Sequence, residues 1–211
     1  PALDQLAGEE PNPGAALKGH VAPLALLMTL SGLFAAFWAQ GFALSQAAMV
    51  EQGAAATLRF LLVYFGAFLF GKAIEALAPR FEARPDAGRA MQLSAYSATA
   101  FILAGFSMLL GFGAPLALAI GAGYSAVLLY LGLPRFMGPP EHRRGGFFAA
   151  LLGVAFAGLV ASGRAYNAAI GTVRSAYQQL LAAAPEPAPT APTGPRLLEP
   201  GAALDAAALA R

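Results

Sequence analysis

Five long apolar stretches divide this sequence of 211 residues, and they constrain its fold more than any other feature. A transmembrane helix needs about 20 mostly apolar residues to cross about 30 Å of hydrocarbon. Each stretch comes close to that length, and none alternates with the period of two that a barrel strand requires. The stretches predict membrane-spanning helices over residues 21–43, 57–78, 91–111, 115–133 and 146–165.

The composition also indicates a membrane protein. Apolar residues make up 58% of the chain and charged residues 11%, whereas soluble domains carry about 25% charged residues. The chain has no cysteine, which excludes a disulfide scaffold, a thiolate nucleophile and an iron–sulfur cluster. A net charge of +2 gives no indication of nucleic-acid binding. We therefore predict an all-α fold, a polytopic transmembrane bundle of about five helices over residues 21–175.

The two ends of the sequence differ from this apolar part. Residues 1–20 contain acidic residues and prolines, and they predict a short cytoplasmic arm rather than a cleavable signal peptide. Residues 185–211 are rich in proline and alanine, and the proline-rich part is typical of an extended segment that does not fold as a helix. We predict a disordered extracytoplasmic tail there and no second domain.

Basic residues concentrate in the loops on one side of the predicted bundle. With five spans, the loops at 79–92 and 134–145 lie on the same side as the N-terminus and form a basic collar. The positive-inside rule places this side in the cytoplasm and the C-terminus in the periplasm, and the composition favours a bacterial inner membrane. The collar could also attract anionic lipids, at about 1 kcal/mol per residue, although such collars usually determine topology alone. Its members are Arg80, Arg84, Arg89, Arg135, Arg143 and Arg144.

The second predicted span carries charged residues. Arg59 and Lys72 are thirteen residues apart, or about 20 Å in a helix, which is less than the hydrocarbon thickness. Either these two side chains snorkel to the two interfaces, or Lys72 and Glu75 form an intramembrane ion pair in a transport path. No acidic residue or histidine lies in the middle of any predicted span, which favours snorkelling.

The last predicted span carries small residues at every fourth position. This spacing lets helix backbones approach closely, and it predicts a packing seam, either within the bundle or in a dimer. The members of this small-residue seam are Ala149, Gly153, Ala157 and Ala161.

No combination of residues predicts catalysis, a cofactor or a metal. His20 and His142 are isolated and form no metal-binding pattern. Residues 121–126 resemble a dinucleotide-binding fingerprint, but they lie in an apolar stretch without the strand that precedes this fingerprint. The sequence therefore predicts a protein that is not an enzyme.

A small-solute carrier or channel is the alternative function. A carrier needs polar side chains along a path through the membrane, and the predicted spans contain few of them. The candidates are Thr29, Ser31, Gln40, Ser94, Ser97, Thr99 and Ser107.

The most distinctive motif is the pattern Y-x5-Y-x-G-L-P-x-x-M-x-P at residues 124–139. It begins inside the fourth predicted span and continues past the end of that span. Gly132 permits a tight turn and Pro134 cannot continue a helix, so the motif predicts that the helix ends there. Its residues are Tyr124, Tyr130, Gly132, Leu133, Pro134 and Pro139.

This motif resembles the bacterial branch of the Yip family, the Rab/Ypt-interacting proteins with five membrane spans. The resemblance extends from about Phe65 to Ile170. It implies a non-catalytic helix bundle that works through contacts with lipids, with other membrane proteins or with copies of itself. The small size of the chain, its lack of a cofactor ligand and its pendant tail suit an accessory or assembly subunit of a larger membrane complex, which is the specific role we expect.

Overall fold

The computed structural model describes residues 12–42, 45–110 and 114–183. Helices account for nearly all of this part of the chain, and it contains no strand, which confirms the predicted all-α fold. Most of the predicted N-terminal arm and the whole predicted tail at 185–211 lie outside the described residues. In chain order the elements are α2 (Pro13–Ala16), the π-helical turn η1 (Leu17–Val21), α3 (Ala22–Ala39), α4 (Gln46–Leu77), the 3₁₀ turn η2 (Ala78–Phe81), α5 (Ala87–Ala104), the 3₁₀ segment η3 (Gly105–Leu110), α6 (Ala114–Phe136) and α7 (Glu141–Ala183).

The first helical segment begins earlier than the span predicted at 21–43. Asn12 Oδ1 accepts hydrogen bonds from the backbone N–H groups of Gly14 and Ala15, both at 3.0 Å. Pro13 occupies the first turn, where its missing N–H has no intrahelical partner to lose. This cap starts the helix at Pro13, and η1 joins it to α3 without an intervening loop.

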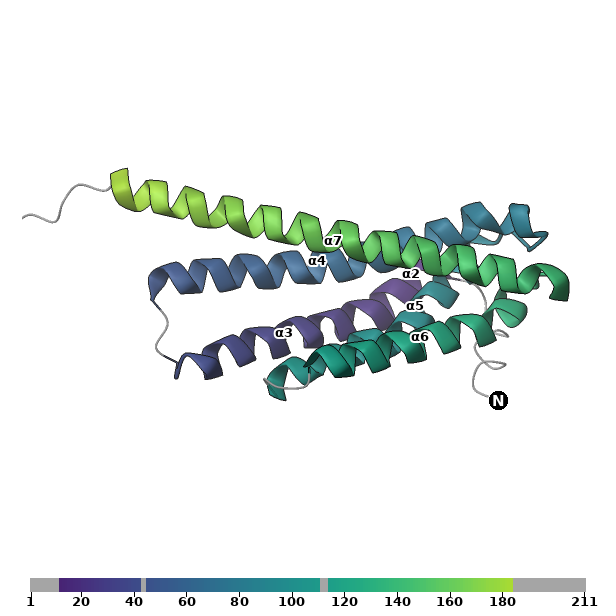
Figure 1. Cartoon of the computed structure of the whole chain (residues 1–211), viewed down its shortest axis with the longest axis horizontal. Helices are drawn as coiled ribbons and strands as arrows, with labels where there is room; N and C mark the ends of the chain where they lie inside the picture. The colour runs from purple at the N-terminus through teal and green to yellow at the C-terminus, as the bar shows by residue number, and fades with distance from the viewer. Residues whose placement is uncertain (1–11, 43–44, 111–113, 184–211) are drawn as a thin grey trace, which may run out of the picture. The chain divides into compact units, whose positions relative to one another are not determined.

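Four segments of the described chain are long and apolar enough to cross a membrane: Gly14–Ala39, Gln46–Phe81, Pro115–Phe136 and Glu141–Ala183. The span predicted at 91–111 corresponds instead to α5, a helix of 18 residues, and to η3, which continues from Gly105. With α5, the bundle has five long helices (Figure 1).

The helix α5 is enclosed between α4 and α6, and α6 runs antiparallel to it. Gly121, early in α6, lies beside Ala104 at the end of α5, whereas Gly132, late in α6, lies beside Leu93 near the start. A Cβ atom on Gly121 would lie 2.4 Å from the Cβ atom of Ala104, so glycine is required for this close approach. Gly121, the first residue of the segment that resembles a dinucleotide-binding fingerprint, is therefore a helix-packing residue.

The largest buried cluster lies where the end of α4, the start of α5, the end of α6 and the start of α7 meet. Phe147 and Leu151 bring α7 into this cluster and are fully buried. No residue of α7 after Leu151 is buried. The first three turns of α7 therefore provide its apolar attachment to the bundle. Other large side chains of the cluster are Ile74, Leu93, Leu133 and Phe136.

Candidate functional site

The motif at 124–139 lies at the end of α6, but it does not end the helix where predicted. Pro134 lies inside α6, which continues to Phe136. The residue that ends the helix is Gly138, which has a positive φ of 59° and donates its N–H to the carbonyl oxygen of Leu133 at 3.1 Å. Because glycine adopts this left-handed conformation without steric cost, Gly138 is the cap. The prediction that the helix ends at Gly132 and Pro134 is wrong.

An arginine from the next helix explains why α6 can continue past Pro134. Proline has no N–H, so the carbonyl of Tyr130, four residues earlier, loses its helical donor. Arg144 of α7 donates from Nη2 to this carbonyl oxygen at 3.1 Å. Its guanidinium carbon also lies 4.1 Å from the centroid of the Tyr130 ring, within cation–π distance. We call Tyr130, Pro134 and Arg144 the proline lock.

Aromatic and apolar side chains surround the proline lock. The rings of Phe81 and Phe147 stack at 5.0 Å, and Phe148 meets Tyr130 edge-on at 5.1 Å. Leu133 is fully buried, and the motif residues Gly132 and Pro139 are buried as well. The other three motif residues, Tyr124, Tyr130 and Pro134, are exposed, with Tyr124 the most open at 58% against 39% for Tyr130.

The basic collar is divided by the structure into two groups. Four of its arginines make internal contacts, and Arg80 and Arg84 are exposed with no hydrogen bond or ion pair from their side chains in the described part of the chain. The internal contacts are Arg89 with Asp86 at 3.8 Å, Arg143 with Glu82 at 3.4 Å, Arg135 with the Leu131 carbonyl at 3.0 Å, and Arg144 with the Tyr130 carbonyl.

The charged residues of α4 take different roles. Lys72 Nζ lies 2.8 Å from Glu75 Oε2, and both side chains are partly exposed. Arg59 turns toward its helical neighbours: its Nη2 lies 3.5 Å from the hydroxyl oxygen of Tyr166, and a Cβ atom on Gly32 would lie 2.1 Å from its Nη1. Arg59 therefore contacts α3 and α7. Snorkelling of its side chain to an interface, which the sequence favoured, stays a prediction.

The small-residue seam lies on the surface. Ala149, Gly153, Ala157 and Ala161 are exposed, and a Cβ atom on Gly153 would meet nothing within 4 Å. The described chain therefore does not use this seam to pack its own helices.

The seven polar residues considered for a transport path bond to the backbone instead. Each donates to a carbonyl oxygen at 2.6–3.3 Å. Ser94 reaches across to the carbonyl of Ala67 in α4, at 2.6 Å, and each of the other six bonds to a carbonyl three or four residues earlier in the chain. These groups are Thr29, Ser31, Gln40, Ser94, Ser97, Thr99 and Ser107.

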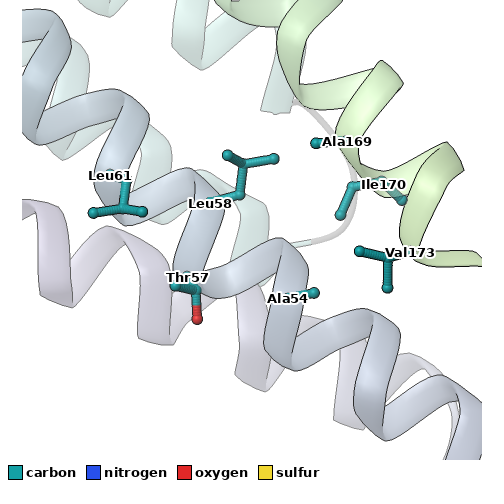
Figure 2. Close-up of a pocket in the computed structure, with 7 residues that line it drawn as sticks. All are labelled: Ala54, Thr57, Leu58, Leu61, Ala169, Ile170 and Val173. Carbon is teal, nitrogen blue, oxygen red and sulfur yellow. The ribbon is translucent and has the colours of Figure 1, made fainter. Parts of the chain in front are cut away.

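A cavity of about 340 Å³ lies between α4 and α7. Figure 2 shows Ala169, Ile170 and Val173 of α7 opposite Ala54 and Leu58 of α4. Thr57 is the one polar residue of the lining and donates to the carbonyl of Gly53. Two polar contacts bracket the cavity along α7: Tyr166 with Arg59, and Arg174 with both carboxylate oxygens of Glu51. The cavity has the chemistry of a lipid-contacting surface, without a charged group for catalysis.

Sequence reasoning missed a polar cluster beside η1. His20 Nε2 lies 2.8 Å from Thr99 Oγ1, and its ring meets Tyr96 edge-on at 5.0 Å. Gln92 lies one turn before Tyr96 on α5 and is 4% exposed; its Oε1 has no hydrogen-bond partner among the described residues. The spacing of 92, 96 and 99 places these side chains on one face of a helix, and this spacing was the available signal. Residues 12–42, 45–110 and 114–183 contain no group of three metal-ligating side chains.

The comparisons with known proteins agree with the motif. The family model described as the Yip1 domain matches residues 12–162, which includes every residue of the proline lock. No curated protein and no solved structure matches the chain.

Proposed function

The chain belongs to the Yip1 domain family, and from this membership we propose that it acts through contacts with membrane partners or lipids, as an accessory or assembly subunit of a larger membrane complex. Its apolar helices fit an integral membrane protein that crosses the bilayer several times. The site geometry supports a non-enzymatic role, because the proline lock uses its one charged group, Arg144, to complete a helix.

The observation that carries this proposal is the outward position of the small-residue seam on α7. A helix turns by about 100° per residue, so Gly153 and Ala157 lie on the side opposite Arg144, Leu151 and Tyr166. Those three residues contact the rest of the chain. Since small residues let membrane helices approach closely, this outward side is suited to a helix of a partner or of a second copy.

We expect Gly153→Leu with Ala157→Leu to weaken assembly about five- to 150-fold. Overpacking a close contact costs about 1–3 kcal/mol, and each 1.4 kcal/mol is a factor of ten. The measurement is the fraction of oligomer or of cross-linked complex in native membranes and after gentle solubilisation. Ala155→Leu, on the opposite side of α7, is the matched control and should leave assembly unchanged. A wild-type protein that is strictly monomeric and without a partner would contradict the proposal.

The alternative of a carrier or channel has no comparable support. The seven polar residues that a path would need donate to backbone carbonyls, as polar side chains of packed membrane helices do.

We further propose five crossings in a bacterial inner membrane, with the N-terminus cytoplasmic and the C-terminus periplasmic. The loop before α5 and the loop after α6 touch: the N–H of Arg84 donates to the carbonyl of Met137 at 2.9 Å, and Arg143 pairs with Glu82. Both loops therefore lie at the same end of the bundle. If α6 crosses the membrane, α5 must cross it as well. The charge of the collar supports placing this end in the cytoplasm.

Cysteine labelling in intact cells tests this topology, because the chain has no cysteine of its own. Single cysteines at Gln46 and Ala176 should react with an impermeant reagent from outside, and a cysteine at Glu141 should react only after the membrane is opened. If α5 did not cross, Glu141 and Ala176 would exchange these behaviours.

A further inference from the structure

Arg80 and Arg84 are the two members of the basic collar whose side chains make no polar contact within the described part of the chain. Both are exposed, and neither side chain forms a hydrogen bond or an ion pair with any described residue. An arginine that is not used within the fold keeps its planar donors available for an external anion.

The acidic residues closest in the sequence to these two arginines are already paired with other cations. They therefore do not compete for Arg80 and Arg84. The pairs are Lys72–Glu75, Arg89–Asp86 and Arg143–Glu82, with N–O distances of 2.8, 3.8 and 3.4 Å.

The backbone that carries the two arginines is fixed at several points. The N–H of Ala83 donates to the carbonyl of Ala78 at 3.0 Å, and the N–H of Arg84 donates to Met137 at 2.9 Å. Phe81, which lies between Ala78 and Ala83 in the sequence, stacks on Phe147. A loop held in this way presents Arg80 and Arg84 from constant positions, so little backbone entropy is lost when a ligand binds.

We infer that Arg80 and Arg84 form a binding site for the phosphate of an anionic phospholipid. The site lies directly after α4, whose segment Gln46–Phe81 is long and apolar enough to cross the membrane, so acyl chains can lie along the helix. A guanidinium binds phosphate through two parallel N–H donors. This inference rests on the lipid half of the proposed function, and helix assembly through the seam does not depend on it.

The test measures lipid preference beside the site. Ala76 is exposed and lies about one turn before Arg80, so Ala76→Cys accepts a fluorophore as the only thiol of the chain. In phosphatidylcholine nanodiscs, spin-labelled phosphatidylglycerol should quench this fluorophore more strongly than spin-labelled phosphatidylcholine. Arg80→Gln and Arg84→Gln should each reduce the preference about fivefold, and the double variant about 25-fold.

Further variants separate the site from net charge. Arg164→Gln removes one exposed charge elsewhere and should leave the preference unchanged, while lysine at both positions should keep part of it. An unchanged preference in the double glutamine variant, or an equal loss with Arg164→Gln, would overturn the inference. Displacement of the labelled lipid by the same concentration of inorganic phosphate would overturn the assignment to a lipid. Assembly of the double glutamine variant should remain at the wild-type level, which separates this site from the seam.

Discussion

Phe147→Ala should lower the free energy of unfolding by about 3–5 kcal/mol. Phe147 is fully buried, and its ring stacks on Phe81 at 5.0 Å with an interplanar angle of 15°. Removing it leaves a cavity at the junction of four helices and takes away one of the two buried residues that hold α7. The measurement is unfolding of the purified protein in detergent micelles, by heat or by added denaturing detergent.

Phe156→Ala is the matched control for this prediction. It removes the same ring from the same helix, but Phe156 is 69% exposed, so we expect a change within about 0.5 kcal/mol. Equal losses for the two variants would show that the start of α7 is not held by the cluster around Phe147.

Arg144→Met should cost about 2–4 kcal/mol of unfolding free energy. The variant keeps most of the apolar stem but removes a charged donor to the Tyr130 carbonyl, worth about 1.5–3 kcal/mol. It also removes the cation–π contact with the Tyr130 ring, worth about 0.5–1 kcal/mol at an exposed position. Unfolding in micelles again gives the loss.

The reason for this loss is tested by the same change in a Pro134→Ala background. Alanine restores the N–H that the Tyr130 carbonyl lacks, so Arg144→Met should then cost at least about 1 kcal/mol less. Coupling of about 0.5–3 kcal/mol is typical of residues that share one partner. If the two changes are additive, Arg144 does not replace the donor that Pro134 removes.

Helix type and approximate position could be predicted from the sequence because they follow from local composition. The apolar stretches near 115–133 and 146–165 correspond to α6 and α7. The end of α6 could not be predicted in this way, because its continuation past Pro134 depends on Arg144, which is ten residues away in the chain. A rule about proline in a helix considers neighbours in sequence, whereas the compensating donor comes from another helix.

The collar and the seam show the same difference between composition and contact. Charge counting identifies Arg84 and Arg143 as equivalent, but in the structure Arg143 pairs with Glu82 and Arg84 does not. Likewise, the spacing of Gly153 and Ala157 predicts a packing face without saying what packs on it. Which face of α7 meets the bundle is decided by Phe147 and Leu151, and the seam lies on the other side.

The proline lock has a consequence for biosynthesis. A ribosome releases Tyr130 and Pro134 before Arg144, so the last turn of α6 emerges while one of its carbonyls still lacks a donor. Until α7 follows, the Tyr130 carbonyl can accept hydrogen bonds only from water or from neighbouring lipid headgroups. At this end of the molecule the earlier helix is completed by the later one, and a chain interrupted before residue 144 cannot finish it.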